Sequence, residues 1–186
     1  RLGVVIESAV EQDGKVTIIA GGEAIDEADI LIAADGINSQ IAREHIGGEA
    51  KFAGYVGALG LCDVPDTPLP IGFAQEIWGV GERFGVFDAA KGDAGMGRRY
   101  WFYMRSAKSD AALADMTLSE IQGAAAGWPA IVRETIEAAA NCIPVTVNAK
   151  PPPKSMGPKQ DGQGRIICIG DAAHPMEPNK GQGACQ

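Results

Sequence analysis

The pattern of apolar and polar residues changes several times along the chain, and each change predicts an element. Residues 2–19 contain two strand-like runs on either side of Asp13-Gly14, a dipeptide that favours tight hairpin turns. We therefore predict a β-hairpin there, with its first strand reaching back to the first residue. The polar stretch GGEAIDEA at 21–28 is predicted to be a loop.

An unbroken apolar run follows at residues 30–34 and is typical of a strand buried on both faces, as in a parallel sheet. An Asp-Gly pair ends this run. The segment INSQIAREHI at 37–46 then predicts a short helix. We expect Asn38 or Ser39 near its start, because short polar side chains accept hydrogen bonds from the free N–H groups of a first helical turn.

Residues 52–105 are different in character, with short strand-like runs rich in aromatic side chains and separated by glycine, proline and aspartate. This pattern predicts an antiparallel sheet that belongs to a second unit. Residues 117–140 are predicted to be helical, and Pro129 is acceptable in a first helical turn. Four apolar residues share one stripe of this helical region: Trp128, Ile131, Val132 and Ile136.

The proline- and glycine-rich stretch at 151–164 is predicted to be an exposed linker. After it, the apolar run RIICIG at 165–170 suits another strand of the first unit. We therefore predict an α/β chain, α+β overall, in which a partial Rossmann-like β/α unit carries an inserted antiparallel-sheet domain. The first unit is assigned residues 1–50, the inserted sheet and following helices 51–150, and the linker and return 151–186.

The composition argues against several classes of function. The 186 residues are 46% hydrophobic and 22% charged, which is ordinary for a globular protein, and the formal net charge of −8 disfavours nucleic acid or an anionic membrane as the main partner. No apolar stretch approaches the ~20 residues that span a bilayer. Four scattered cysteines without a C-x-x-C pair, together with two histidines, predict neither a metal site nor a redox pair. They favour a cytoplasmic protein with reduced thiols.

Two of the predicted strands end in sequences that can carry chemistry. The first ends in Ala-Asp-Gly, with Asp35 and Gly36, and the second in Gly-Asp-Ala-Ala-His, with Asp171. Ligands of open α/β sheets bind beyond the carboxyl ends of strands, where an aspartate can accept hydrogen bonds from sugar or polyol hydroxyls. Glycine beside it lets the backbone approach a ligand closely. Taken singly, each aspartate is more readily explained as a helix cap or a turn former.

Taken together, in this order and separated by an inserted sheet, the two motifs resemble a known family. ADILIAADGINSQIAR is similar to the DG motif, and GRIICIGDAAHPMEPNKGQGACQ to the GD motif, of the flavin-dependent aromatic hydroxylases related to para-hydroxybenzoate hydroxylase. The chain departs from the family pattern at Lys180 and at NAK, 148–150, which stands where an Asp-Arg pair is usual. The family's N-terminal G-x-G-x-x-G unit is not among these residues, so we expect an internal fragment.

The resemblance implies that flavin adenine dinucleotide (FAD) is the cofactor. Asp171 would accept charge-assisted hydrogen bonds from the ribityl chain, and Pro178 would line the flavin ring where dioxygen adds. Residues 181–183 would open a helix whose free N–H groups face the flavin ring. The DG motif would lie near the pyrophosphate. The implied cofactor-binding residues are Asp35, Gly36, Ser39, Arg43, Gly170, Asp171, Ala172, Pro178, Gly181, Gln182, Gly183 and Ala184.

The implied reaction is monooxygenation: NADH or NADPH reduces FAD, dioxygen forms a flavin hydroperoxide, and one oxygen atom goes to an aromatic or similarly electron-rich small molecule. The substrate would lie against the inserted sheet, where Phe84, Phe87, Trp101 and Tyr103 are candidate wall residues, unless they are sheet core. Arg83, Arg98 or Arg99 would pair with a substrate carboxylate, unless they are surface charges. His174 is a base or, preferably, a packed histidine that shapes the turn after its strand, whereas His45 is expected on the surface.

Other possibilities stay open. The chain is alternatively an inactive truncated FAD-binding fragment, or part of a flavin epoxidase or reductase on the same scaffold. No metal is required for the implied chemistry. The expected partners are a small aromatic substrate and dioxygen, with NADH or NADPH as the co-substrate and a homo-oligomer left open.

Overall fold

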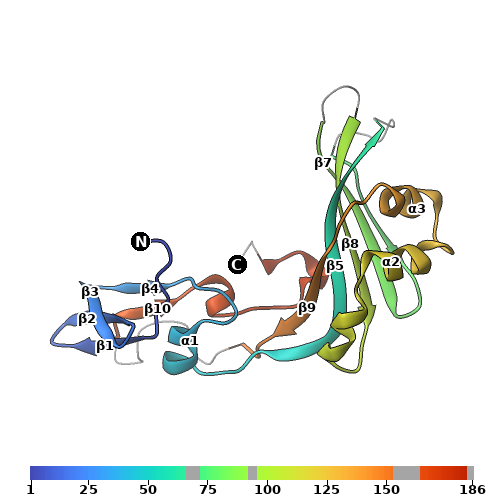
Figure 1. Ribbon diagram of the computed structural model, residues 1–186. Helices are drawn as coiled ribbons and strands as arrows, with labels where there is room; N and C mark the ends of the chain where they lie inside the picture. Colours follow the sequence, from blue (N-terminus) through green and yellow to red (C-terminus); the bar gives the residue numbers. More distant parts are fainter. Residues whose placement is uncertain (66–71, 92–95, 153–163, 184–186) are drawn as a thin grey trace. The chain divides into compact units, whose positions relative to one another are not determined.

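The computed structural model describes residues 1–65, 72–91, 96–152 and 164–183, and it divides into two compact units (Figure 1). Unit 1 comprises Arg1–Ala53 and Asn148–Gln186, and unit 2 comprises Gly54–Val147. The first unit is thus left and re-entered by the chain. The borders lie close to those that the hydrophobic pattern suggests, after residues 50 and 150.

Unit 1 begins with a three-stranded antiparallel sheet in the order β1-β2-β3. The predicted hairpin is confirmed: β1 and β2 pair from Gln12↔Lys15 outward. Asp13 (φ 51°) and Gly14 (φ 78°) between them both lie in the left-handed region, as a two-residue hairpin turn of this kind requires. The strands are β1 (Ser8–Gln12), β2 (Lys15–Ala20) and β3 (Glu23–Ala28).

Two details of the sequence prediction were wrong in this sheet. Residues 21–28 are not all loop, because β3 pairs with β2 along most of this stretch. The strand is polar since only Ile25 and Ala28 are half-buried and the other side chains are exposed; backbone hydrogen bonds to β2 rather than burial hold it in place. The first strand also does not reach the start of the chain, and residues 1–7 form no strand.

A second, two-stranded sheet pairs β4 (Leu31–Ala33) with β10 (Ile166–Cys168) in parallel. This pairing confirms that the chain returns to its first unit after the insertion (Figure 1). Burial on both faces was wrong, because Ile30 and Ile32 are 56% and 58% exposed. The other face packs into the core of unit 1, which consists of Ala9, Val16, Ala33, Ile41, Ala42, Ile166, Cys168, Ala172 and Ala173.

The predicted short helix is α1 (Gln40–His45), and Ser39 is its N-cap. The Ser39 hydroxyl accepts a hydrogen bond from the backbone N–H of Ala42 at 2.9 Å. Both residues are fully buried, so water cannot replace this bond. The cap therefore anchors α1 against the parallel strand pair.

We expect Ser39→Ala to destabilise the full-length protein by about 1–2 kcal/mol, because the buried Ala42 N–H loses its acceptor. Thr117→Ala is the matched control: Thr117 caps α2 by accepting from the Glu120 N–H at 3.2 Å, but it is exposed and water can take its place. Urea denaturation of both variants measures the two losses. A Thr117→Ala loss equal to or larger than that of Ser39→Ala would contradict the account of a buried cap.

Unit 2 is built on a five-stranded sheet in the order β6-β7-β8-β5-β9. The pairs β6-β7, β7-β8 and β5-β8 are antiparallel, which confirms the predicted sheet, whereas β9 was not predicted. Most of the separating stretches PDTPLP (65–70) and KGDAGMG (91–97) and most of the linker, 153–163, lie outside the described residues. The strands are β5 (Lys51–Pro65), β6 (Ala74–Trp78), β7 (Glu82–Lys91), β8 (Met96–Ser106) and β9 (Ile143–Ala149).

The helical region of unit 2 is broken into a 3₁₀ turn, Asp110–Asp115, and the helices α2 (Leu118–Ala125) and α3 (Ala130–Glu137). The break falls at Trp128-Pro129 because a residue before proline is disfavoured in a helix, and Pro129 becomes the N-cap of α3. The buried side of α3 includes Val132 and Ile136, as the predicted stripe requires. No helix in the described part of the chain is long and apolar enough to cross a membrane.

The two faces of the unit 2 sheet have different surroundings. Phe84 of β7 and Trp101 of β8 stack at 6.0 Å, and Phe84 also meets Trp128 from the α2–α3 connection at 6.3 Å, so this face lies under the helices. Successive strand residues point to opposite faces. Tyr100 and Phe102 therefore lie on the second face, which no described helix of unit 2 covers (Figure 1). We call this second face the open face.

Candidate functional site

The two aspartate motifs leave the same edge of the parallel strand pair. Ala33 of β4 lies opposite Cys168 of β10, and Ile169 continues the pairing by donating its N–H to the Ala33 carbonyl at 3.0 Å. Asp35 lies two residues after Ala33, and Gly170 lies two residues after Cys168. The pKa of the Cys168 thiol is raised, first by burial and then by the nearby Asp35 carboxylate. The two motifs are far apart in sequence, and the pairing of β4 with β10 brings them side by side.

A tight 3₁₀ turn, Gly170–Ala172, presents the Asp171 side chain to solvent. The Gly170 carbonyl accepts from the N–H groups of Ala173 at 3.0 Å and His174 at 2.9 Å. Because Ala172 and Ala173 are buried in the core, Asp171, which precedes them, is turned outward. Among the described residues, none donates a hydrogen bond to the Asp171 carboxylate, so it is an exposed acceptor at the strand end.

The glycines of both motifs leave open space beside the backbone. Gly36 (φ +81°) and Gly170 (φ +56°) adopt left-handed conformations that other residues rarely tolerate. A Cβ atom at either position would meet nothing within 4 Å. Asp35 is also exposed, and the chain turns after it as the Ser39 N–H bonds to the Gly36 carbonyl at 2.9 Å. A ligand can therefore approach the backbone at both turns.

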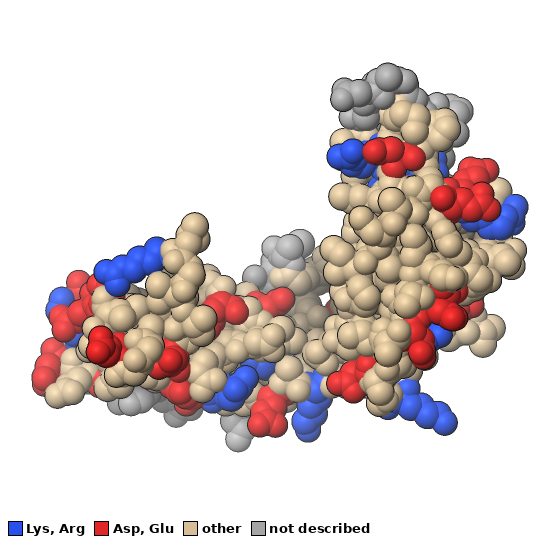
Figure 2. Space-filling model, in the orientation of Figure 1, with Lys and Arg blue, Asp and Glu red and all other residues tan. Residues whose placement is uncertain are grey.

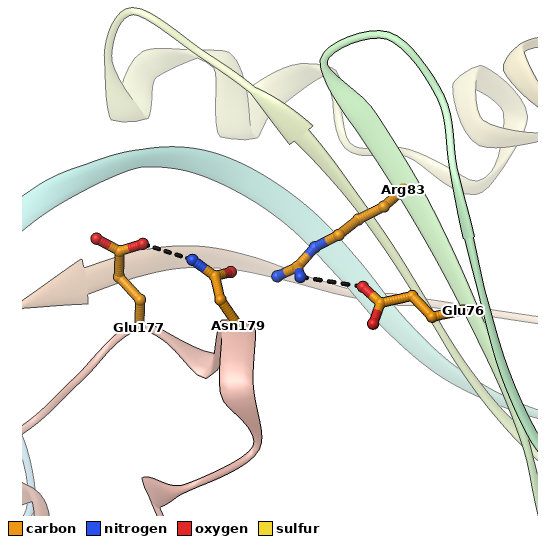
Figure 3. Close-up of polar contacts among 4 residues, drawn as sticks. All are labelled: Glu76, Arg83, Glu177 and Asn179. Carbon is orange, nitrogen blue, oxygen red and sulfur yellow. Dashed lines mark hydrogen bonds and ion pairs between the residues drawn. The ribbon is translucent and has the colours of Figure 1, made fainter.

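The segment after the GD motif forms a second 3₁₀ turn, Pro178–Lys180, ended by Gly181 in a left-handed conformation (φ +61°). The Gly181 N–H bonds to the Pro178 carbonyl at 3.0 Å. Asn179 donates to the Glu177 carboxylate at 2.6 Å and braces this turn (Figure 3). Gln182 and Gly183 follow, and Ala184, with the rest of the predicted helix, lies outside the described residues.

Several residues expected at the site have other partners in unit 1. The Ser39 hydroxyl caps α1. Arg43 is exposed on α1 and donates to the Gln40 side chain at 3.0 Å. His45 is on the surface as predicted, with its Nε2 atom 3.2 Å from the Ala9 carbonyl oxygen. The main-chain bond from His174 to Gly170 favours the turn-shaping interpretation, although its Nδ1 atom is buried without a partner among the described residues.

Lys150 was missed as a neighbour of this edge. Its N–H bonds to the Pro175 carbonyl at 3.1 Å, and its charge acts on Cys168 by lowering the thiol pKa against the larger effect of burial. The departure NAK, at 148–150, was the available signal. A lysine at this strand edge, where Asp35 and Asp171 also lie, supplies a cation there.

The expected substrate-wall residues Phe84, Trp101 and Tyr103 are buried between the sheet and the helices. They therefore form core, the alternative that the sequence left open. Tyr103 donates a short hydrogen bond to Glu82, and burial together with this carboxylate raises its pKa. Among the aromatic residues of β7 and β8, the half-buried ones lie on the open face: Phe87, Tyr100 and Phe102.

The interpretation of the sheet arginines as surface charges was wrong for two of the three. Arg99 is 3% exposed and contacts Thr135 of α3 at 3.4 Å, beside Asp88. Arg83 is 9% exposed. Arg98 is on the surface and forms a two-point contact with Asp63, at 2.8 and 3.1 Å. Charged side chains visible on the molecule are spread over both units instead of gathering in one patch (Figure 2).

The comparison with protein families decides the class of the chain. A family model described as an FAD binding domain matches residues 10–185. The chain belongs to the FAD binding domain family. This membership places its two aspartate motifs in a flavoprotein scaffold, as the resemblance implied.

Relatives of this FAD binding domain include monooxygenases. It is 31% identical over 175 residues to an aurachin C monooxygenase/isomerase of Stigmatella aurantiaca, covering 94% of the chain and 43% of that protein. It is 28% identical over 183 residues to a 6-hydroxynicotinate 3-monooxygenase of Bordetella bronchiseptica, covering 94% of the chain and 45% of that protein. The chain spans about half the length of the curated relatives it matches.

The fold also matches a solved structure. HpxO of Klebsiella pneumoniae, crystallised with FAD and uric acid, superposes with a TM-score of 0.78 at 25% identity, covering 98% of the chain and 46% of that protein. The mixed architecture predicted from the sequence, a β/α unit carrying an inserted antiparallel sheet, is thus shared with this FAD-bound protein.

Proposed function

We propose that the full-length protein is an FAD-dependent monooxygenase that uses NADH or NADPH and dioxygen to hydroxylate an aromatic or similarly electron-rich small molecule. The carrying observation is the position of Asp35 and Asp171 at one edge of the parallel pair β4-β10, in a chain of the FAD binding domain family. The names of the relatives support the reaction class. Bound FAD supplies the redox chemistry that activates dioxygen.

The residues at this edge suit FAD. Asp171 is an exposed carboxylate with no donor among the described residues, and a sugar-alcohol chain offers hydroxyl donors to such an acceptor. Gly36 and Gly170 leave open space in which a cofactor can approach the backbone. We assign Asp171 to the ribityl chain, with Gly170 and Ala172 forming the turn that presents it. Asp35 and Gly36 are assigned to the pyrophosphate side.

The segment after the turn has a separate role in the proposal. Pro178 lacks an N–H group, so it can line a flavin ring without donating a hydrogen bond there. Gln182 and Gly183 would supply backbone N–H groups to the ring edge, and Gly181, whose own N–H bonds to the Pro178 carbonyl, would turn the chain toward it. These groups would stabilise negative charge on the reduced ring, because backbone N–H groups in a site that excludes water are already oriented and need no reorganisation.

We expect the purified full-length protein to oxidise NADH or NADPH faster when an aromatic substrate is present. A suitable aromatic panel is 6-hydroxynicotinate, uric acid and aurachin C, with oxygen uptake and product mass as readouts. The proposal predicts a product heavier by one oxygen atom from at least one compound. Oxidation of the nicotinamide with no oxygenated product would favour a reductase, and epoxide formation from an isoprenoid alone would favour an epoxidase; either result overturns aromatic hydroxylation.

A further inference from the structure

Phe102 lies flat across a glycine on the open face of unit 2. Gly85 of β7 pairs directly with Phe102 of β8. A Cβ atom built on Gly85 would lie 2.2 Å from Cε1 and 2.5 Å from Cζ of that ring, far inside contact distance. The ring therefore occupies the space that any side chain at position 85 would need. Only glycine allows this ring to lie down on the sheet.

The same arrangement occurs once more on this face. Gly57 of β5 pairs with Met104 of β8, and a Cβ at Gly57 would lie 2.3 Å from the methionine Sδ atom. It would also lie 2.3 Å from the Tyr103 carbonyl oxygen, so no larger residue fits without moving backbone. Two glycines thus keep neighbouring side chains of β8 low. On this face the β8 side chains therefore lie close to the sheet.

The ring of Phe102 is also held from its sides. Phe87 packs against it with ring centroids 5.9 Å apart, and Tyr100 packs against Phe87 at 5.7 Å. The Arg83 guanidinium lies 5.7 Å from the Phe102 ring centroid and 5.6 Å from that of Trp78. Arg83 is fixed in turn by Glu76 at 3.0 Å (Figure 3). Phe102 therefore has little freedom to rotate upright.

We propose that Phe102, lying over Gly85, forms the floor of the substrate site and selects flat ring systems. The inference rests on the proposed function and concerns the depth of the same site. A flat aromatic ring offers a stacking surface of about its own area to a planar substrate. A methyl group added under the Phe102 ring would raise this floor and leave less room for a close-fitting substrate ring. In a hydrophobic pocket, a group of this size changes the discrimination between substrates by roughly tenfold or more.

The test is Gly85→Ala in the full-length protein, with whichever member of the aromatic panel the wild-type protein hydroxylates. We expect the dissociation constant and KM of that compound to rise about tenfold or more, while FAD content stays at the wild-type level. Phe102→Leu added to Gly85→Ala removes the ring that the new methyl group strikes, and should recover part of the lost affinity. Phe102→Leu alone should weaken the binding of planar compounds and improve the relative binding of thicker, non-planar analogues.

Two glycine variants serve as controls. Gly123→Ala, on α2, adds a methyl group that meets nothing within 4 Å and should change neither binding nor FAD content. Gly60→Ala adds one that would lie 2.4 Å from the Trp101 ring on the helix-covered face. It should therefore lower stability, without the selective rise in KM.

The outcomes separate the two proposals. A wild-type protein that hydroxylates a panel compound, with a Gly85→Ala variant that binds it unchanged, overturns the floor and leaves the proposed function standing. Equal loss of FAD and substrate in Gly85→Ala overturns it as well, because the effect would then be structural. If Gly85→Ala does not fold, an unchanged preference of Phe102→Leu for planar over non-planar analogues overturns it. A wild-type protein that holds no FAD, or that oxidises NADH or NADPH with panel compounds without forming any oxygenated product, refutes the proposed function itself.

Discussion

Full-length protein carrying Asp171→Ala should retain much less FAD than the wild-type protein after dialysis. The Asp171 carboxylate is exposed at the end of β10, and the turn behind it is fixed by two hydrogen bonds to the Gly170 carbonyl. Loss of a charge-assisted bond to a ribityl hydroxyl costs about 1.5–3 kcal/mol, or roughly tenfold or more in affinity. Flavin absorbance per protein measures the change.

Two variants sharpen this expectation. Asp171→Asn keeps an acceptor oxygen but removes the charge, so its FAD content should lie between those of the wild type and Asp171→Ala. Asp110→Ala removes an exposed carboxylate from the 3₁₀ turn of unit 2 and should leave FAD content unchanged. An Asp171→Ala protein as yellow as wild type after dialysis would refute the assignment of this carboxylate to the cofactor.

Trp101→Ala should destabilise unit 2 by about 3–5 kcal/mol, the largest loss that we expect from any single substitution in the sheet. Trp101 is fully buried, stacks on Phe84 and lies over Gly60, so its removal leaves a cavity that the sheet and helices cannot close. FAD content and substrate-stimulated NAD(P)H oxidation should therefore fall together. Denaturant unfolding followed by circular dichroism measures the loss of stability.

The matched control is Trp78→Ala, which removes the same side chain where it is 70% exposed. Trp78 contributes mainly a contact with the Arg83 guanidinium, and such a contact at an exposed site is worth about 0.5–1 kcal/mol. If Trp101→Ala were as stable as Trp78→Ala and altered only substrate turnover, Trp101 would line the substrate site after all. That result would contradict its placement in the core.

The sequence carried enough information to predict how the aspartate motifs meet. Two apolar runs far apart in the chain, each followed by an Asp-Gly or Gly-Asp turn, can share a parallel sheet only if the segment between them is inserted, and β4 pairs with β10 in this way. The start of α1 was predictable to within one residue, Asn38 or Ser39, because short polar side chains accept from the free N–H groups of a first helical turn; the structure assigns the cap to Ser39. Local chemistry and topology agreed at these positions.

The faces of the inserted sheet could not be assigned from the pattern alone. The run RRYWFYM in β8 places aromatic residues at consecutive positions, so both faces of the strand are aromatic and alternation gives no direction. Packing against α3 and the Trp128 connection decides that Trp101 and Tyr103 are core. The flat position of Phe102 depends on Gly85 in the neighbouring strand, a cross-strand relation that one strand's sequence does not contain.

The polar strand β3 escaped prediction for a related reason. Hydrophobic periodicity detects strands that bury one face, whereas most side chains of β3 are exposed and its place is set by pairing with β2. Lys150 was not predicted as a neighbour of Cys168, because the two residues come together only in the folded chain and no local pattern signals it.

A crystal structure of the full-length protein with FAD tests the central claim most directly, because that claim concerns the position of the cofactor. We predict that a ribityl hydroxyl lies within about 2.5–3.0 Å of an Asp171 carboxylate oxygen, with Asp35 and Gly36 beside the pyrophosphate. FAD bound away from the edge formed by the ends of β4 and β10, or an Asp171 carboxylate that contacts only water in the complex, would contradict the account.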